Sequence, residues 1–390
     1  MKKIVSKETI KPSSSTPHHL RKLNLSLLDQ IAPPTYVDLL FFYQSPDLDD
    51  SQLSKNLKNS LSHVLTAFYP LAGRIIPHDS CVDCNDDGVE YVEFRVHACM
   101  SDVARFDPDP AELQKYVPVE PYGLLGSHEK GEVIPLSIQV NLFDCGGIAI
   151  GVCISHTLAD IESLVMFMNA WATTCRHGTM LDSIRPCFDL TRGFPPLDPS
   201  AFASKPQPPL VKTLERSSRK VNVRSKASPP LPAHSFGNGC VSATAWSSKP
   251  ESEDEQESYA VLVTKLRNAI RDIDQDYVKQ VQDGDYYERM KKQWDEVDDV
   301  WSEACIFSSW CRFGVYEVDY GWGKPVWVST IGVPFKNVIV FMDTRCGDGI
   351  EAWVSMVEED MDVIETNYKH LILSAPLIAS LVRAIAYGLE

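Results

Sequence analysis

The residues best suited to chemistry begin with a histidine at the end of a strand-like run. His156 precedes Asp160 by four residues, in the string His-Thr-Leu-Ala-Asp. An imidazole with a pKa of about 6.5 is largely neutral at pH 7 and can take a proton from a hydroxyl that attacks a carbonyl carbon. On this string alone, a histidine that only stabilises a turn would also fit. Asp160 could orient the imidazole or brace the loop by pairing with an arginine, and we favour the brace.

A second motif is more specific, because it combines scarce residue types. Asp319, Tyr320, Gly321, Trp322 and Gly323 follow one another. The glycines permit backbone conformations that other residues avoid. Such a loop suits a domain interface or a ligand channel, and the alternative is a tight turn over a buried tryptophan. Together the two motifs indicate acyl transfer.

Other reaction classes lose support because their motifs are missing from the sequence. It contains no Gly-x-Ser-x-Gly elbow, no phosphate-binding Gly-x-x-x-x-Gly-Lys loop, no dinucleotide fingerprint and no His-Glu-x-x-His site. The close pair Cys81 and Cys84 has no second pair or histidine at zinc spacing, so we expect no metal site. Hydrolase, kinase, dehydrogenase and zinc-protease functions are therefore disfavoured.

The amino-acid composition limits which partners the protein could bind and which cellular compartment it suits. The 390 residues are 44% hydrophobic and carry a formal charge of −16, which disfavours nucleic acid and anionic membranes as partners. Most of the 11 cysteines stand singly in apolar runs, as in a reducing compartment. The charged first residues lack the apolar core of a secretory signal, and no apolar run is long enough to span a bilayer. We expect a cytoplasmic protein.

Three strands are expected ahead of His156. Residues 90–96 and 137–143 alternate between apolar and polar types, which is typical of strands. Residues 147–154 are apolar throughout, which indicates a central strand buried on both faces. The turn at residues 144–147 joins the last two strands as a hairpin.

Helical spacing of apolar residues predicts helices over residues 50–68 and 160–176. His156 then lies in a strand-to-helix turn, where mixed α/β sheets place their chemistry. The second half of the chain is also rich in strand-like segments, with strands expected over residues 325–330, 337–342 and 350–357.

A proline-rich stretch divides the chain. Residues 194–215 hold too many prolines for a helix or a strand and are the best linker candidate. We expect an N-terminal domain over residues 1–193, which carries His156, and a C-terminal domain over residues 216–390, which carries the second motif.

At this point the chain resembles the plant BAHD acyltransferases, which move an acyl group from a coenzyme A thioester to an alcohol or amine. The resemblance covers nearly the whole chain and is strongest to the alkaloid and small-alcohol acetyltransferases of that family. The segments that carry it, besides the two motifs, are residues 25–29 (LSLLD), 69–75 (YPLAGRI), 221–224 (VNVR), 234–238 (HSFGN), 309–313 (SWCRF) and 343–349 (DTRCGDG).

The resemblance implies an α/β fold of two chloramphenicol-acetyltransferase-like domains. Each would be a mixed sheet with flanking helices, and an active-site channel would lie between them. The protein would act as a monomer on acyl-CoA, by preference acetyl-CoA, and on an alkaloid or terpenoid alcohol. It would form a ternary complex without a metal or a permanently bound cofactor.

The resemblance also implies roles for particular residues. His156 would be the general base, and Asp160 would pair with Arg224 from the second domain. Asp319 is counted with the catalytic set, although the loop to Gly323 would mainly shape the channel on the coenzyme A side. The residues implied in acyl-CoA binding are Ser235, Gly237 and Asn238.

One departure from the family pattern bears on activity. The family has a strand and a long helix between the linker and the segment matching residues 221–224, whereas here only residues 211–220 remain. Some tens of residues are therefore missing near the start of the second domain. The alternative to an active enzyme is a catalytically impaired or inactive family member that binds ligands.

Overall fold

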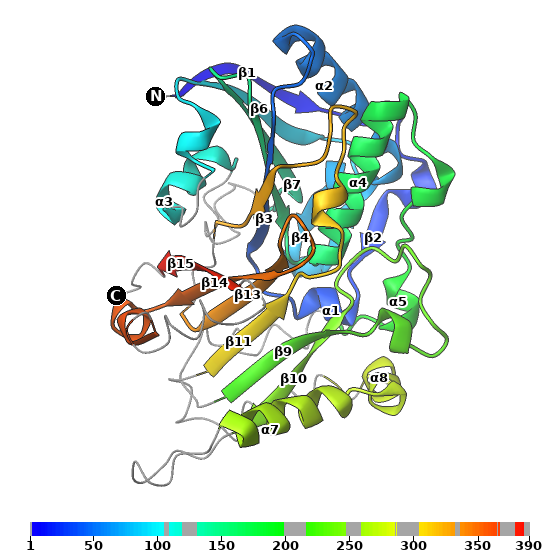
Figure 1. Ribbon diagram of the computed structural model, residues 1–390. Coiled ribbons are helices and arrows are strands. Elements are labelled where there is room, and N and C mark those ends of the chain that lie inside the picture. The colour runs from blue at the N-terminus through cyan, green and yellow to red at the C-terminus, as the bar shows by residue number, and fades with distance from the viewer. Residues whose placement is uncertain are drawn as a thin grey trace.

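The computed structural model describes residues 2–104, 109–118, 131–198, 216–246, 259–284, 286, 304–331, 336–364, 366 and 379–385. These residues form two six-stranded mixed sheets with flanking helices (Figure 1). Strands from the first half of the chain make up most of one sheet, in the upper part of the view, and strands from the second half make up the other. The expected α/β class with two sheet-containing halves is confirmed.

The first sheet carries the strand that leads to His156. All its neighbouring strands pair antiparallel except β6 and β7, which run parallel. Its order is β1 (Lys2–Ile10), β6 (Val89–Val96), β7 (Leu136–Phe143), β8 (Ile148–Ser155), β3 (Tyr36–Tyr43) and β12 (Trp327–Ser329). The strands expected over residues 90–96, 137–143 and 147–154 are present as β6, β7 and β8.

The polar residues of β7 are buried, although they alternate with apolar ones. The Gln139 side chain donates to the Lys115 carbonyl at 2.9 Å, and the Asn141 side chain donates to the carbonyls of Tyr116 at 2.9 Å and Ala149 at 3.1 Å. The segment around Tyr116 therefore covers this face of the sheet. Its backbone supplies the partners that buried amides require.

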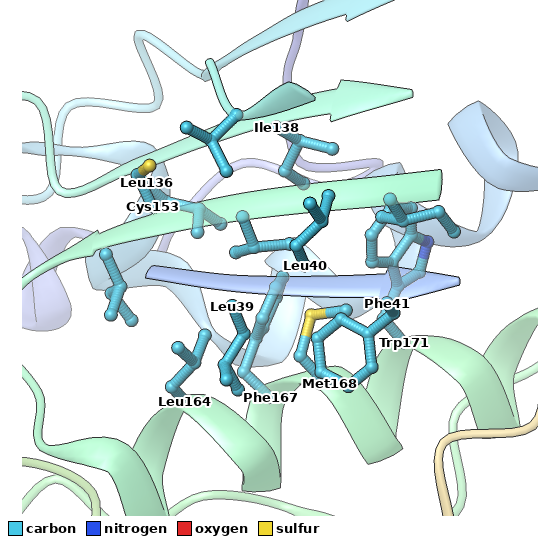
Figure 2. Packing of buried hydrophobic residues seen from close by; sticks show 14 of the residues in the cluster. Leu39, Leu40, Phe41, Leu136, Ile138, Cys153, Leu164, Phe167, Met168 and Trp171 are labelled. Carbon is cyan, nitrogen blue, oxygen red and sulfur yellow. The ribbon is translucent and has the colours of Figure 1, made fainter. Parts of the chain in front are cut away.

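Two helices cover the other face of the first sheet. α2 (Asp50–Ala67) and α4 (Ile161–His177) pack against each other, and the Trp171 indole of α4 donates to the Leu57 carbonyl of α2 at 3.2 Å. Figure 2 shows Leu164, Phe167, Met168 and Trp171 of α4 against the strands. The helical spacing of these apolar residues gives α4 the buried face that holds it on the sheet.

The second sheet mixes parallel and antiparallel neighbours. Strands β9 and β11, β11 and β13, and β14 and β15 run parallel, and the other pairs run antiparallel. Its order is β10 (Cys240–Trp246), β9 (Arg216–Asn222), β11 (Ala304–Ser309), β13 (Val338–Asp343), β14 (Ile350–Met356) and β15 (Ala379–Ile385). The helix α7 (Tyr259–Arg271) packs on β10 and β9. β9 thus overlaps residues 211–220, which are all that remain where the family pattern has a strand and a long helix.

The remaining elements are short and surround the two sheets. Three strands form a small antiparallel sheet, and the helices are one or two turns long. They are β2 (Lys22–Asn24), β4 (Arg74–Ile76), β5 (Cys81–Asp83), α1 (Leu27–Gln30), α3 (Pro110–Leu113), α5 (Leu190–Gly193) and α8 (Gln275–Gln282).

One strand from the second half completes the first sheet. β12 pairs antiparallel with β3, and the Trp327 ring stacks on Phe42 with ring centres 5.0 Å apart. The buried Asp38 carboxylate of β3 also accepts hydrogen bonds from the Thr330 hydroxyl at 3.1 Å and the Ile331 amide at 2.8 Å. The second half of the chain therefore contributes a strand to the sheet of the first half. Of the predicted linker, residues 199–215 lie outside the described residues.

No helix within the described parts of the chain is both long and apolar enough to cross a membrane.

Candidate active site

His156 stands directly after β8, and both halves of the chain hold its backbone. Its amide donates to the Thr35 carbonyl at 2.8 Å, and its carbonyl accepts from the Asn238 side-chain amide at 2.7 Å. Thr35 comes just before β3, whereas Asn238 comes just before β10. The histidine is therefore fixed at the junction of the two sheets, as the strand-to-helix turn predicts.

The surroundings of His156 keep its imidazole neutral. Burial lowers the pKa of His156, and the positive charge of Lys220 lowers it further. The Asp160 carboxylate, the Asn238 side chain and the histidine's own backbone act in the opposite direction but do not outweigh these causes. A neutral imidazole is the form that accepts a proton.

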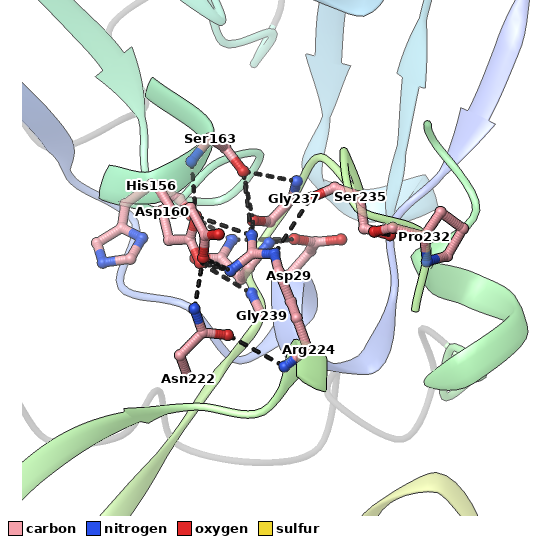
Figure 3. Close-up of polar contacts among 12 residues, drawn as sticks. Asp29, His156, Asp160, Ser163, Asn222, Arg224, Pro232, Ser235, Gly237 and Gly239 are labelled. Carbon is pink, nitrogen blue, oxygen red and sulfur yellow. Dashed lines mark hydrogen bonds and ion pairs between the residues drawn. The ribbon is translucent and has the colours of Figure 1, made fainter. Parts of the chain in front are cut away.

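The Asp160 carboxylate is directed away from the His156 ring and into a buried ion pair (Figure 3). Its two oxygens accept from the Arg224 guanidinium at 2.8 and 3.0 Å, in a two-pronged contact. Asp160 also caps α4 by accepting from the Ser163 amide at 3.0 Å, and it accepts from the Gly239 amide at 2.9 Å. The pairing of Asp160 with Arg224 that the sequence predicts is present.

Arg224 is fully engaged by its neighbours. Its guanidinium donates to the carbonyls of Gly237 at 2.7 Å and Ser235 at 3.1 Å, and to Glu162 at 2.8 Å. A side chain at Gly239 would meet the guanidinium at 2.4 Å, so glycine is required there. Burial raises the pKa of Asp160, but the charge and hydrogen bonds of Arg224 outweigh burial and lower it overall. The pair is therefore ionised, and Asp160 acts as a brace.

The residues predicted to bind acyl-CoA lie inside this network. Ser235 and Asn238 are buried, and the Ser235 hydroxyl donates to the Pro232 carbonyl at 2.9 Å. The Gly237 amide donates to the Ser163 hydroxyl at 3.0 Å, and its carbonyl accepts from Arg224. In this structure Gly237 and Asn238 hold the two halves of the chain together, whereas the Ser235 hydroxyl bonds within the second half. Contact of the three residues with acyl-CoA stays a prediction.

Asp29 supports His156 indirectly, through Asn238. The sequence did not reveal this role. One carboxylate oxygen accepts from both the backbone and the side-chain amide of Asn238, at 2.8 and 2.9 Å. The other oxygen accepts from the Ser26 amide and hydroxyl at 3.0 and 2.6 Å. Asn238 in turn holds the His156 carbonyl. Burial raises the pKa of Asp29 to about 6, against the effect of these hydrogen bonds.

The motif that begins at Asp319 forms a tight loop. The Asp319 carboxylate accepts from the Gly321 and Gly323 amides at 2.8 and 3.0 Å. Both glycines have a φ above +100°, which other residues rarely adopt. Tyr320 is buried and stacks on Trp322 with ring centres 5.2 Å apart.

This loop lies at the far end of α4 from His156. Asp319 pairs with Arg176 in the last turn of α4 at 3.7 Å, whereas Asp160 caps the first turn. A helix of 17 residues at about 1.5 Å each separates its ends by about 25 Å. Asp319 therefore does not reach the atoms that react at His156. We place Asp319 with the architecture of the protein and not with the catalytic residues.

Polar atoms without protein partners concentrate at the two motifs. Native proteins pair most buried polar groups, so unpaired ones mark sites with another purpose. Among the described residues, eight buried side-chain atoms have no hydrogen-bond partner, and five belong to the two motifs or to residues that adjoin or bind His156. These five are Ser155 Oγ, His156 Nδ1, Asn238 Oδ1, Tyr320 Oη and Trp322 Nε1.

Lys220 is a second residue that the sequence did not single out. It lies on β9 two positions before Asn222, whose side chain donates to Glu162 in the first turn of α4. Side chains two apart on a strand share a face, so Lys220 is also on the side of β9 toward His156. Lys220 belongs to no motif, whereas Asp29 ends the segment of residues 25–29 that carries the resemblance, and only the fold brings both to the histidine.

His156 therefore stands at the end of a strand between two mixed α/β sheets, with a lowered pKa. The Transferase family model matches residues 2–220 and 218–371. The chain therefore belongs to this family, the BAHD acyltransferases, and is an enzyme of the acyl-CoA-dependent acyltransferase class.

Individual relatives match almost end to end. The chain is 36% identical to stemmadenine O-acetyltransferase of Catharanthus roseus, with 95% of this chain and 97% of the relative covered. It is 33% identical to limonoid 7-O-acetyltransferase of Citrus sinensis, with 95% and 97% covered. The crystal structure of vinorine synthase superposes with a TM-score of 0.79 at 34% identity, covering 94% of this chain and 97% of that one.

The comparisons also bear on the missing segment. The family model matches in two pieces that meet at residues 218–220, directly before the segment 221–224. The alignment with stemmadenine O-acetyltransferase spans 433 positions, which is more than the 390 residues of this chain. The alignment therefore contains gaps in this chain, and a loss at the start of the second half stays a prediction.

Proposed function

We propose that this protein transfers an acyl group, by preference acetyl, from acyl-CoA to a hydroxyl of an alkaloid or terpenoid alcohol. The observation that carries the proposal is His156, which is held from both halves of the chain beside unpaired polar atoms and keeps a lowered pKa. Relatives that acetylate an alkaloid or a limonoid support the choice of acyl group and acceptor.

The mechanism follows from the two ring nitrogens of His156. Nδ1 is buried and has no hydrogen-bond partner among the described residues, so it cannot reach a substrate, and we assign the ring proton to it. A proton on Nδ1 leaves Nε2 with the free electron pair, so Nε2 is the base. It removes the proton from the acceptor hydroxyl as the oxygen attacks the thioester carbonyl. The tetrahedral intermediate then collapses, and the protonated imidazole returns the proton to the leaving sulfur of coenzyme A.

Asp160 and Arg224 contribute by position alone. Their buried pair joins the first turn of α4 to the segment after β9, across the two sheets. It keeps the Asp160 carboxylate occupied, so His156 has no acidic partner that would raise its pKa strongly. Both substrates would meet the histidine in a ternary complex, and no covalent enzyme intermediate is required.

The test is release of free coenzyme A thiol from acetyl-CoA in the presence of a panel of alkaloid and terpenoid alcohols. We expect His156→Ala to lower kcat/KM by a factor of about 10²–10⁴, the usual worth of a general base. His78→Ala is the matched control, because His78 is 75% exposed and lies away from the site. Equal activity in wild type and His156→Ala, with both folded by circular dichroism, would refute the proposed base.

The split family match favours one second candidate, a family member that binds acyl-CoA without turning it over. A ligand that binds only the native state raises the melting temperature. A thermal shift with coenzyme A and no thiol release with any acceptor would select this candidate. We further propose that the protein is a cytoplasmic monomer, which size-exclusion chromatography with light scattering and fractionation of the source cells would test.

A further inference from the structure

A pair of exposed cysteines lies outside the site described so far. The parallel strands β6 and β7 end side by side, with Val96 opposite Phe143. The chains stay in contact beyond the sheet, because the Asp144 amide donates to the Val96 carbonyl at 3.1 Å. His97 and Asp144 side chains then meet at 3.1 Å. The next residues on the two segments bring Cys99 and Cys145 together.

The side chains of Cys99 and Cys145 lie in adjacent segments. The Met100 amide, which directly follows Cys99, donates to the Cys145 sulfur at 3.2 Å. Both cysteines are exposed. Each is anchored, since Cys99 starts a short helix as its cap and Cys145 sits in the tight β7–β8 turn.

The two thiols differ in reactivity. Burial opposes ionisation of Cys145, but the Met100 and Gly147 amides and the Cys99 thiol outweigh burial and lower its pKa. The neighbouring Cys145 sulfur raises the pKa of Cys99. A thiolate is the attacking species in thiol–disulfide exchange, so Cys145 is the nucleophile and Cys99 the resolving partner.

We propose that Cys99 and Cys145 form a dithiol that a disulfide oxidant such as oxidised glutathione converts into an intramolecular disulfide. The Cys145 thiolate attacks one sulfur of oxidised glutathione, which forms a mixed disulfide and expels one glutathione thiolate. Cys99 then loses its proton and attacks the Cys145 sulfur, and the second glutathione leaves. Two protein thiols are oxidised and one glutathione disulfide is reduced to two thiols.

The disulfide would strengthen the fold without stopping catalysis. It would tie the end of β6 to the β7–β8 turn and close the chain between residues 99 and 145, which restricts the unfolded state. β8 separates this turn from His156 by eight residues, or about 26 Å at about 3.3 Å each. The oxidised protein would therefore resist unfolding and keep its activity.

The experiment exposes the reduced full-length protein to oxidised glutathione, alkylates the remaining thiols and maps disulfide-linked peptides by mass spectrometry. We expect one linked peptide that contains Cys99 and Cys145, and none in Cys99→Ser or Cys145→Ser. Cys346→Ser is the matched control, because Cys346 is exposed and its loss should leave the link in place. Separate glutathione adducts on the two cysteines, or a link to any other cysteine, would overturn the proposal.

A second measurement tests the consequence. The melting temperature of oxidised wild type should exceed that of the reduced protein, and Cys145→Ser should show no difference between the two treatments. An oxidised protein that carries the link but melts at or below the temperature of the reduced one would show that the link strains the fold.

Discussion

The lowered pKa of His156 predicts how kcat/KM depends on pH. A base whose pKa lies below the ordinary 6.5 stays neutral at lower pH. We therefore expect kcat/KM to be level above pH 6.5 and to fall only below it, as the imidazole becomes protonated. A profile that falls with decreasing pH from well above 6.5 would contradict this environment for His156.

Substitution of Lys220 should shift the pH profile of kcat/KM. Its charge is, after burial, the main cause that lowers the pKa of His156, whereas Asp160 acts in the opposite direction and is paired with Arg224. Lys220→Met should raise the pKa of His156, so the acidic fall in kcat/KM should begin at higher pH. Arg219→Met is the control, because Arg219 is on the opposite face of β9 and should leave the profile unchanged.

The sequence predicted His156 and Asp160 as residues of the site and assigned no role to Asp29 or Lys220. His156 follows an apolar strand and Asp160 opens a helix, so local patterns were enough to place them. Asp29 and Lys220 come within range of His156 only through contacts between distant segments, which no local pattern encodes. Asp319 was counted with the catalytic set because of the resemblance, and the structure places it at the last turn of α4, at the opposite end of this helix from Asp160.

At the scale of elements, the ion pair of Asp160 and Arg224 is the main tie between α4 and the second half. Removing one partner of a buried pair leaves an uncompensated charge, which costs about 3–5 kcal/mol. We expect Arg224→Ala to lower the free energy of unfolding by that amount in urea denaturation at pH 7. Arg185→Ala should change it by less than about 1 kcal/mol, because Arg185 pairs with Asp182 on the surface.

The pKa of Asp160 determines how the stabilisation by the Asp160–Arg224 ion pair changes with pH. The pKa of Asp160 is lowered below 3.8 in the folded state, so the pair stabilises the protein above pH 3.8. The difference between wild type and Arg224→Ala should therefore shrink as pH falls below 3.8. A difference that stays constant to lower pH would mean that the lost stability comes from packing alone.

Asp38 on β3 should show the opposite dependence. Burial raises the pKa of Asp38 from 3.8 to about 7, against its hydrogen bonds to Thr330 and Ile331. The folded state thus favours the protonated form, and stability is lost as pH rises from about 4 through 7. Asp38→Asn keeps an acceptor oxygen without the charge, so it should melt at a higher temperature than wild type at pH 8 and similarly near pH 4. Asp182→Asn, at a 92% exposed side chain, should show no such difference.

Element positions were largely predictable, whereas element partners were not. Period-two spacing placed β6, a continuous apolar run placed β8, and helical spacing placed α2 and α4, each nearly to the residue, because each pattern is local. The pairing of β12 with β3 could not be read in this way, since it joins segments almost 300 residues apart whose own patterns only say that they are strands. Burial of both faces of β7 likewise depends on a covering segment.

For the whole molecule, the strand β12 that the second half contributes to the first sheet means that the N-terminal half is incomplete by itself. A fragment of residues 1–193 lacks β12, and its β3 would present Phe41 and Phe42 beside an open edge. We expect this fragment to unfold without a cooperative transition in urea, in contrast to the full chain. Joining residues 324–331 to the fragment through a flexible linker should restore part of the cooperativity. A cooperative transition in the unmodified fragment would show that β12 is dispensable.

The pairing of β3 with β12 cannot form until late in synthesis of the chain on the ribosome. β3 ends at Tyr43 and β12 begins at Trp327, so β3 emerges long before its partner. At about 5–20 residues per second, the wait lasts roughly 15 to 60 seconds. Throughout that time an apolar strand edge is open to pairing with other nascent chains. Yield in a cell should therefore depend on chaperones that act while the chain is still being made.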